Sequence, residues 1–293
     1  MAPLLRRKWK RAGADGVDVV AELNLGAQGA GNPAQGASLA EQIFAVAHRA
    51  VVRTVRQRAL MIFPMIFPLI LFAINGSALS PATRIPGFPT ANYRDFLIAM
   101  PFVQGAMFVS ITAGVDLARD IESGFLNRLA MTPIRGQALL VGQLGGALVL
   151  GIVQAVVYLL VGLASGVSFA SGVGGAFVLL ALSIVISFAF ASLGGLLALR
   201  FGTGGAVQGI FPLLFVTIFL SSSSLPRNLI KATWFRDIAT YNPVSYLLEA
   251  LRSLVITGWD AQALALGFGF AGALLVISLG LSQSAMKTRL GRT

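Results

Sequence analysis

Six long stretches of the chain carry almost no charge, and they constrain the fold more than any other feature. Each extends for 18 residues or more, the length at which an apolar helix crosses the core of a bilayer. Only 11% of the 293 residues are charged, against about 25% in a soluble domain. The sequence therefore predicts an all-α, multi-pass membrane protein. The expected spans are residues 59–79, 96–117, 138–164, 173–199, 206–223 and 261–285.

The composition also excludes several kinds of chemistry. The chain has no cysteine and a single histidine, His48, so it offers no set of side chains typical of a metal site. A phosphate-binding P-loop needs a lysine after a glycine, and none of the four lysines follows one. We therefore expect a non-catalytic chain that binds neither a metal nor a cofactor of its own.

The positions of the basic residues predict the orientation in the membrane. With the N-terminus in the cytoplasm, 16 of the 22 Lys and Arg residues lie on the cytoplasmic side of the six spans, as the positive-inside rule requires. Both termini are then cytoplasmic. The net charge of +11 is explained by this topology, and no nucleic-acid partner is expected.

The six spans together form a transmembrane domain over residues 59–286. Three further segments flank this domain. Residues 1–37 are basic at the start and then rich in Ala and Gly, which is typical of a flexible tail. Residues 38–58 predict an amphipathic helix, with Arg49, Arg53 and Arg56 opposite an apolar stripe. Such a helix lies on a membrane surface, or it is an ordinary solvated helix. Residues 287–293 are expected to form a C-terminal cytoplasmic tail.

A dense polar segment, Leu117–Gln137, connects the second and third spans. By the topology above it is cytoplasmic. Asp120–Met131 can form a short helix that ends before Pro133, because the residue before a proline avoids helical angles. A short helix between two spans is suited to receive force from a cytoplasmic partner. The alternative is a charged loop that serves topology alone.

Part of this segment resembles a known family. The run ESGFLNRLAMTP, Glu122–Pro133, resembles the E-x-G…L-x-x-T-P segment of ABC-2 type transporter permeases, in particular the daunorubicin-resistance branch of drug and lipid exporters. Tyr241–Val255 is similar to the Asn-Pro segment of that family, and Phe211–Pro226 to its fifth span. The resemblance covers residues 38–289. It implies a coupling helix at about 118–135 that docks on a separate ATPase. The contact residues it implies are Glu122, Gly124, Arg128, Thr132 and Pro133.

The same resemblance implies the partners and the setting. Residues 39–58 would be the connecting helix, which also touches the ATPase. Two ATPase subunits, which bind ATP and Mg, would join this permease and a second copy or a homologous permease. The location would be a bacterial plasma (inner) membrane, with membrane lipid around the spans. The cargo would be a lipophilic drug, a lipid or a polyketide-like molecule.

Two other functions remain open from the sequence. A secondary transporter driven by an ion gradient is disfavoured, because no acidic residue lies near the middle of a span, where a proton relay would need one. A non-transporting membrane scaffold would use the basic tail to recruit partners or anionic lipid.

Five phenylalanines are candidates for the substrate path. They recur every four residues on two spans and so share a helix face on each. Pro64 and Pro68 could kink the first of these spans. Phenylalanine at this spacing also packs in cores or faces lipid, which is the alternative. The candidates are Phe63, Phe67, Phe211, Phe215 and Phe219.

Residues 226–256 are expected to form two short helices that bend back into the outer leaflet before the last span. Asn242 and Pro243 suit the N-cap and first turn of the second helix. Glu249 and Arg252 are three residues apart and are expected to pair. In the resembled family this outer element closes the exit, so these four residues are predicted to form an outer gate.

Overall fold

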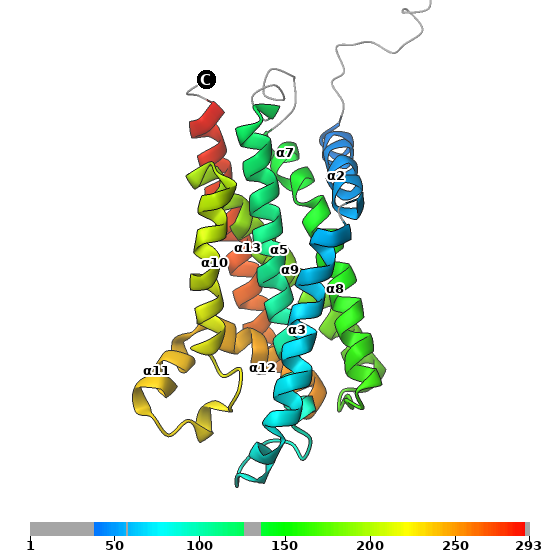
Figure 1. Ribbon diagram of the computed structural model, residues 1–293, viewed down its shortest axis with the longest axis vertical. Helices are drawn as coiled ribbons and strands as arrows, with labels where there is room; N and C mark the ends of the chain where they lie inside the picture. The colour runs from blue at the N-terminus through cyan, green and yellow to red at the C-terminus, as the bar shows by residue number, and fades with distance from the viewer. Residues whose placement is uncertain (1–37, 57, 126–135, 291–293) are drawn as a thin grey trace, which may run out of the picture. The chain divides into compact units, whose positions relative to one another are not determined.

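The computed structural model describes residues 38–56, 58–125 and 136–290, and throughout that part of the chain the regular structure is helical (Figure 1). Leu39–Thr293 form one compact unit. The all-α prediction is confirmed there. The longer helices are α2 (Leu39–Arg56), α3 (Arg58–Ala78), α5 (Ala99–Glu122), α7 (Gly136–Gln143), α8 (Gly145–Ala164), α9 (Gly172–Phe201), α10 (Gly204–Phe219), α12 (Pro243–Ile256) and α13 (Ala261–Leu290).

Five stretches of the described chain are long and apolar enough to cross a membrane: Met61–Ala78, Tyr93–Glu122, Ala138–Ala164, Gly172–Phe201 and Ala261–Met286. They correspond to the first four predicted spans and the last. The predicted fifth span corresponds to α10, which has only 16 residues and ends at Phe219, before the predicted end at 223. The last helix continues to Leu290, so the predicted C-terminal tail begins inside a helix.

Helix α5 is the most enclosed helix of the unit, with 18 of its 24 residues buried. It contacts α3, α8, α9, α10 and α12. Its approach to α9 is so close that a Cβ at Gly194 would collide with the carbonyl oxygen of Ser110. Only glycine fits at that position, and small residues at helix crossings let membrane helices pack tightly.

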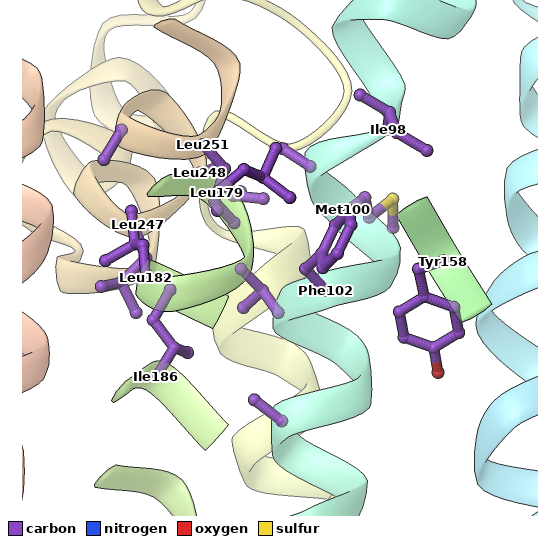
Figure 2. Packing of buried hydrophobic residues seen from close by; sticks show 14 of the residues in the cluster. Ile98, Met100, Phe102, Tyr158, Leu179, Leu182, Ile186, Leu247, Leu248 and Leu251 are labelled. Atoms are coloured by element: carbon purple, nitrogen blue, oxygen red, sulfur yellow. The ribbon is translucent and has the colours of Figure 1, made fainter. Parts of the chain in front are cut away.

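The main core lies where α5, α8, α9 and α12 meet, and Figure 2 shows its large apolar side chains. Phe102 of α5 meets Tyr158 of α8 edge to face, with ring centroids 5.7 Å apart. Leu182 of α9 and Leu248 of α12 are fully buried. These contacts fix the helices around α5.

Helix α2 confirms that a helix precedes the first span, and its position on a membrane surface stays a prediction. One face of α2 packs closely against α7 and α8. A Cβ at Gly142 would collide with Val46, and a Cβ at Gly146 would collide with Thr54. Two of its arginines, Arg49 and Arg53, contact α5, whereas Arg56 is exposed. Helix α2 is therefore docked on the bundle.

The segment predicted as a separate coupling helix begins differently from expectation. The residues from Asp116 to Glu122 are the last turns of α5, which stops at Ser123. Gly124 has a φ of +67°, a left-handed conformation that commonly ends helices at glycine. Residues 126–135, including Arg128, Thr132 and Pro133, lie outside the described residues.

Before the last helix, the two expected short helices are present as α11 (Thr233–Tyr241) and α12. They lie at the opposite end of the bundle from α2 (Figure 1). A short 3-10 turn at Arg227–Leu229 precedes them. Another short helix, α4 (Tyr93–Leu97), leads into α5.

Candidate functional site

At the end of the bundle that carries α2, two arginines of α2 meet two aspartates of α5. Arg53 reaches both, at 3.2 Å from Asp116 Oδ2 and 3.0 Å from Asp120 Oδ1. Arg49 donates to both oxygens of Asp120, at 3.3 and 3.4 Å. Residues four apart on a helix share one face, so the two pairs present matched charges.

Asp120 is the centre of this charged junction. It is 5% exposed and also accepts a hydrogen bond from the side-chain amide of Gln143, on α7. A buried carboxylate is tolerated only when it is paired and hydrogen-bonded. One carboxylate therefore joins α2, α5 and α7.

Glu122 extends the same junction to a fourth helix. Its Oε1 accepts a hydrogen bond of 3.1 Å from the backbone N–H of Gly204, the first residue of α10. Helix N-termini favour such anionic partners. The guanidinium of Arg49 lies 3.7 Å from the ring centroid of Phe125. Among the residues that the structure describes, none beyond its immediate chain neighbours comes within 4 Å of a Cβ placed on Gly124.

The five predicted phenylalanines lie in one cluster with a sixth, Phe108 of α5, which the sequence did not single out. The Phe63–Phe67 and Phe211–Phe215 centroids are 5.7 and 5.2 Å apart. Phe108 lies 6.0 Å from Phe63, 5.7 Å from Phe67 and 5.0 Å from Phe211. Phe219 contacts Phe215 at 5.8 Å. Phe108 thus joins the aromatic faces of α3 and α10.

A cavity of about 500 Å³ lies beside this cluster, between α3, α5 and α10. Two of the predicted five, Phe63 and Phe211, line it. Its wall is aromatic and aliphatic on one side and polar on the other, where α5 approaches the charged junction. The lining residues are Phe63, Pro64, Phe108, Ile111, Thr112, Val115, Asp116, Arg119, Gln208 and Phe211.

At the α11–α12 end, the predicted cap is confirmed. Asn242 Oδ1 accepts from the backbone N–H of Val244 at 2.9 Å, with Pro243 in the first turn of α12. The side-chain amide of Asn242 also donates to the carbonyl of Thr217, in α10, at 2.7 Å. This asparagine therefore starts α12 and ties it to α10.

Replacing Asn242 with Ala is expected to lower the free energy of unfolding by about 1–2 kcal/mol, because a cap and a partly buried hydrogen bond are lost together. Thermal unfolding in detergent measures the change. Asn228→Ala, at an exposed position, is the matched control. An Asn242→Ala protein as stable as the control would show that neither bond matters.

The expected ion pair between Glu249 and Arg252 is wrong. Glu249 pairs with Arg227 instead, through an Nε–Oε1 hydrogen bond of 2.6 Å. Burial alone would lower the pKa of Arg227, but the hydrogen bond to Glu249 and its charge outweigh burial and raise it. Glu249 also accepts from the hydroxyl of Ser222 at 3.2 Å.

Arg252 is instead held by backbone carbonyls. It is 5% exposed and donates to Phe96 O at 2.8 Å and to Ser222 O and Ser223 O at 2.6 Å each. Its guanidinium lies 3.6 Å from the centroid of the Phe96 ring. Burial lowers its pKa, yet arginine remains charged in proteins. One side chain thus joins α12, the turn after α10 and the start of the α4–α5 stretch.

No group of three or more potential metal ligands occurs among the residues that the structure describes. The chain thus presents a membrane helix bundle with a largely apolar cavity that reaches the charged junction at one end of the bundle. At the other end of the bundle, the buried Arg252 joins three segments. That arrangement is typical of the membrane part of a transporter.

Comparison with known proteins identifies the class. The family model described as ABC-2 type transporter matches residues 41–256, and the chain belongs to this family. It is similar to the "Daunorubicin resistance ABC transporter permease protein DrrB1" of Streptomyces coeruleorubidus, with 27% identity over 76% of this chain and 74% of that protein. It is also similar to the "Probable doxorubicin resistance ABC transporter permease protein DrrC" of Mycobacterium tuberculosis, with 23% identity over 68% and 69%.

The protein is accordingly the transmembrane permease subunit of an ABC exporter, as the resemblance in the sequence implied. Permease subunits of this family associate with an ATP-binding cassette ATPase.

Proposed function

We propose that this permease moves a lipophilic cargo outward through the aromatic cavity, driven by ATP hydrolysis in a separate partner chain. Two ATPase subunits, which bind ATP and Mg, would serve this permease and a second copy or a homologous one. The cargo would be a drug, a lipid or a polyketide-like molecule. A drug is supported by the names of the two relatives, which refer to resistance to daunorubicin and doxorubicin. The setting would be a bacterial plasma membrane.

The proposed topology has six spans and both termini in the cytoplasm. Helix α10, although short, would be the fifth span, because the adjoining residues to Ser223 and the α11–α12 segment would cover the missing depth from the outer leaflet. The exposed Trp234 and Tyr241 of α11 suit the headgroup region of a membrane. Asn242, Pro243, Glu249 and Arg252 would then hold the outer gate.

One observation carries the proposal: α5 forms a wall of the cavity and ends in the charged junction, next to the segment that would contact the ATPase. Asp116 belongs to both, since it lines the cavity and pairs with Arg53. A displacement of the Glu122–Pro133 segment by the ATPase would reach the cavity wall along one rigid helix. Glu122, Gly124, Arg128, Thr132 and Pro133 would form the contact, and α2 would support it.

Purification of the tagged permease from its native membranes tests the proposal. A stoichiometric ATPase with a P-loop should copurify, and inside-out vesicles should accumulate daunorubicin when ATP is supplied. Arg128→Ala should reduce that accumulation more than tenfold, because a charge at the contact is lost, while thermal stability stays unchanged. Arg236→Ala, exposed in α11, is the control.

Other outcomes would point elsewhere. Accumulation that follows an ion gradient and ignores ATP would replace this proposal with a secondary transporter. A complex that holds no ATPase and moves no probe would indicate a scaffold.

A further inference from the structure

Helix α3 contains two prolines, both on its buried face. Pro64 and Pro68 are buried, together with Phe72 and Gly76 at the same spacing of four, whereas Ile62, Ile66, Ile70 and Ile74 are exposed. A proline has no amide proton and cannot bond to the carbonyl four residues earlier. Pro68 therefore leaves the carbonyl of Pro64 without its helical partner, facing the interior of the bundle.

The hydroxyl of Tyr158 supplies the missing donor. It comes from α8 and donates to the carbonyl oxygen of Pro64 at 3.0 Å, in a buried position. Tyr158 is 1% exposed. Inside a membrane the freed carbonyl has no water to bond, so a neighbouring helix must supply the donor.

The neighbours of the ring fix Tyr158 in this position. Phe102 lies against it edge to face (Figure 2). One turn further along α5, Gly105 also approaches the ring, and a Cβ there would lie 2.7 Å from Tyr158 Cε2. Because α5 packs against the ring at both positions, the hydroxyl cannot move away from α3 without repacking α5.

The interrupted turn of α3 forms part of the cavity wall. Phe63 and Pro64 line it, and Phe67, between the two prolines, contacts Phe108 and Phe215 with centroids 5.7 and 6.1 Å apart. A change of bend at this turn would move both phenylalanines relative to α5 and α10.

We propose that Pro64–Pro68 is a hinge and that the Tyr158 hydroxyl is its latch, replacing the amide proton that Pro68 lacks. Tyr158 is then a positioning residue, since it sets the cavity wall through α3. Its consequence for cargo rests on the proposed function, whereas the hydrogen bond and the bend do not.

A double-mutant cycle tests the latch, with Tyr158→Phe, Pro68→Ala and the two combined, each as the full chain in lipid nanodiscs without ATPase or cargo. Pro68→Ala restores a backbone donor for the carbonyl of Pro64. With Pro68 present, Tyr158→Phe should shift the unfolding equilibrium roughly 10-fold toward the unfolded state, because a buried carbonyl is orphaned. In the Pro68→Ala background, the same change should shift it less than about twofold. Tyr241→Phe, at an exposed position, is the matched control.

A second readout follows the bend itself. The chain has no cysteine, so spin labels can be placed at Ile62→Cys and Ile74→Cys on the exposed face, about 18 Å apart along the axis. Tyr158→Phe should change the distance distribution between the labels when Pro68 is present and leave it unchanged in the Pro68→Ala background. An equal effect of Tyr158→Phe in both backgrounds, or none in either, would overturn the latch. The proposed transport function would be untouched by that result, because neither readout uses transport.

Discussion

Asp120→Asn is expected to release α2 from the bundle and to abolish coupled transport. The substitution keeps the shape of the side chain but removes its negative charge. That charge pairs with Arg49 and Arg53, and the carboxylate also accepts a hydrogen bond from Gln143. Removing one partner of a buried ion pair costs about 3–5 kcal/mol. Arg49 is partly exposed and can be hydrated again, and Arg53 keeps its ion pair with Asp116. We therefore expect the free energy of unfolding to fall by about 3 kcal/mol, the lower end of that range.

Hydrogen exchange across α2 measures this effect directly, because a loosened helix loses protection. ATP-driven accumulation of daunorubicin in vesicles measures the functional loss, expected to exceed tenfold. Asp237→Asn, exposed in α11, carries the same chemical change away from the junction. Unchanged protection of Leu39–Arg56 in Asp120→Asn would mean that the glycine contacts alone hold α2.

Arg252→Lys is expected to destabilise the α11–α12 end as strongly, although it keeps the charge. Arginine bonds three carbonyls at once because its guanidinium is a planar fork, whereas lysine offers one compact ammonium group. At least two buried carbonyls would lose their donor, at about 1–3 kcal/mol each. We therefore expect the free energy of unfolding to fall by about 3 kcal/mol.

Thermal unfolding of Arg252→Lys, Arg252→Met and the exposed control Arg236→Lys separates charge from hydrogen bonding. Both Arg252 variants should unfold well below the control, since both orphan the carbonyls of Phe96, Ser222 and Ser223. A buried charge is often replaceable by an apolar side chain without loss. A stable Arg252→Met protein would therefore show that the carbonyls do not depend on this side chain.

Asp120 and Arg252 make their contacts at opposite ends of the stretch that contains α5. Asp120 joins its last turn to α2 and α7, and Arg252 binds the carbonyl of Phe96 shortly before its first turn. The cavity lies between them, along α5. A helix fixed at both ends by buried charged groups transmits displacement as a unit, which fits the proposed coupling.

The sequence predicted most of the long helices and their approximate ends, because long apolar runs and local cap signals act over neighbouring residues. Asn242 and Pro243 were assigned to the start of a helix from their own chemistry, and the structure agrees. The shared face of Phe211, Phe215 and Phe219 follows from spacing alone. The chain also revealed its family through the ordered segments around Glu122, Phe211 and Tyr241.

The partners of charged side chains were predicted less well. Glu249 and Arg252 are correctly spaced for a pair on one helix, yet Arg227 and three carbonyls compete successfully for them. The junction at Asp120 had a visible signal, since Arg49 and Arg53 match Asp116 and Asp120 in their spacing of four. The spacing does not say whether the arginines contact the aspartates, because each pair of charges could equally face water.

The sequence by itself determined that this is a helical membrane protein of the ABC-2 permease type, since hydrophobic length and local motifs are properties of the chain. Only the tertiary structure decided which helices share Asp120, how Arg252 is held, that Phe108 completes the aromatic cluster, and that Tyr158 meets the carbonyl freed by Pro68. The polar contacts among these join residues 23 to 156 positions apart in the chain. Burial selects them, because in a dry interior each polar group must find a partner from whichever helix packs beside it.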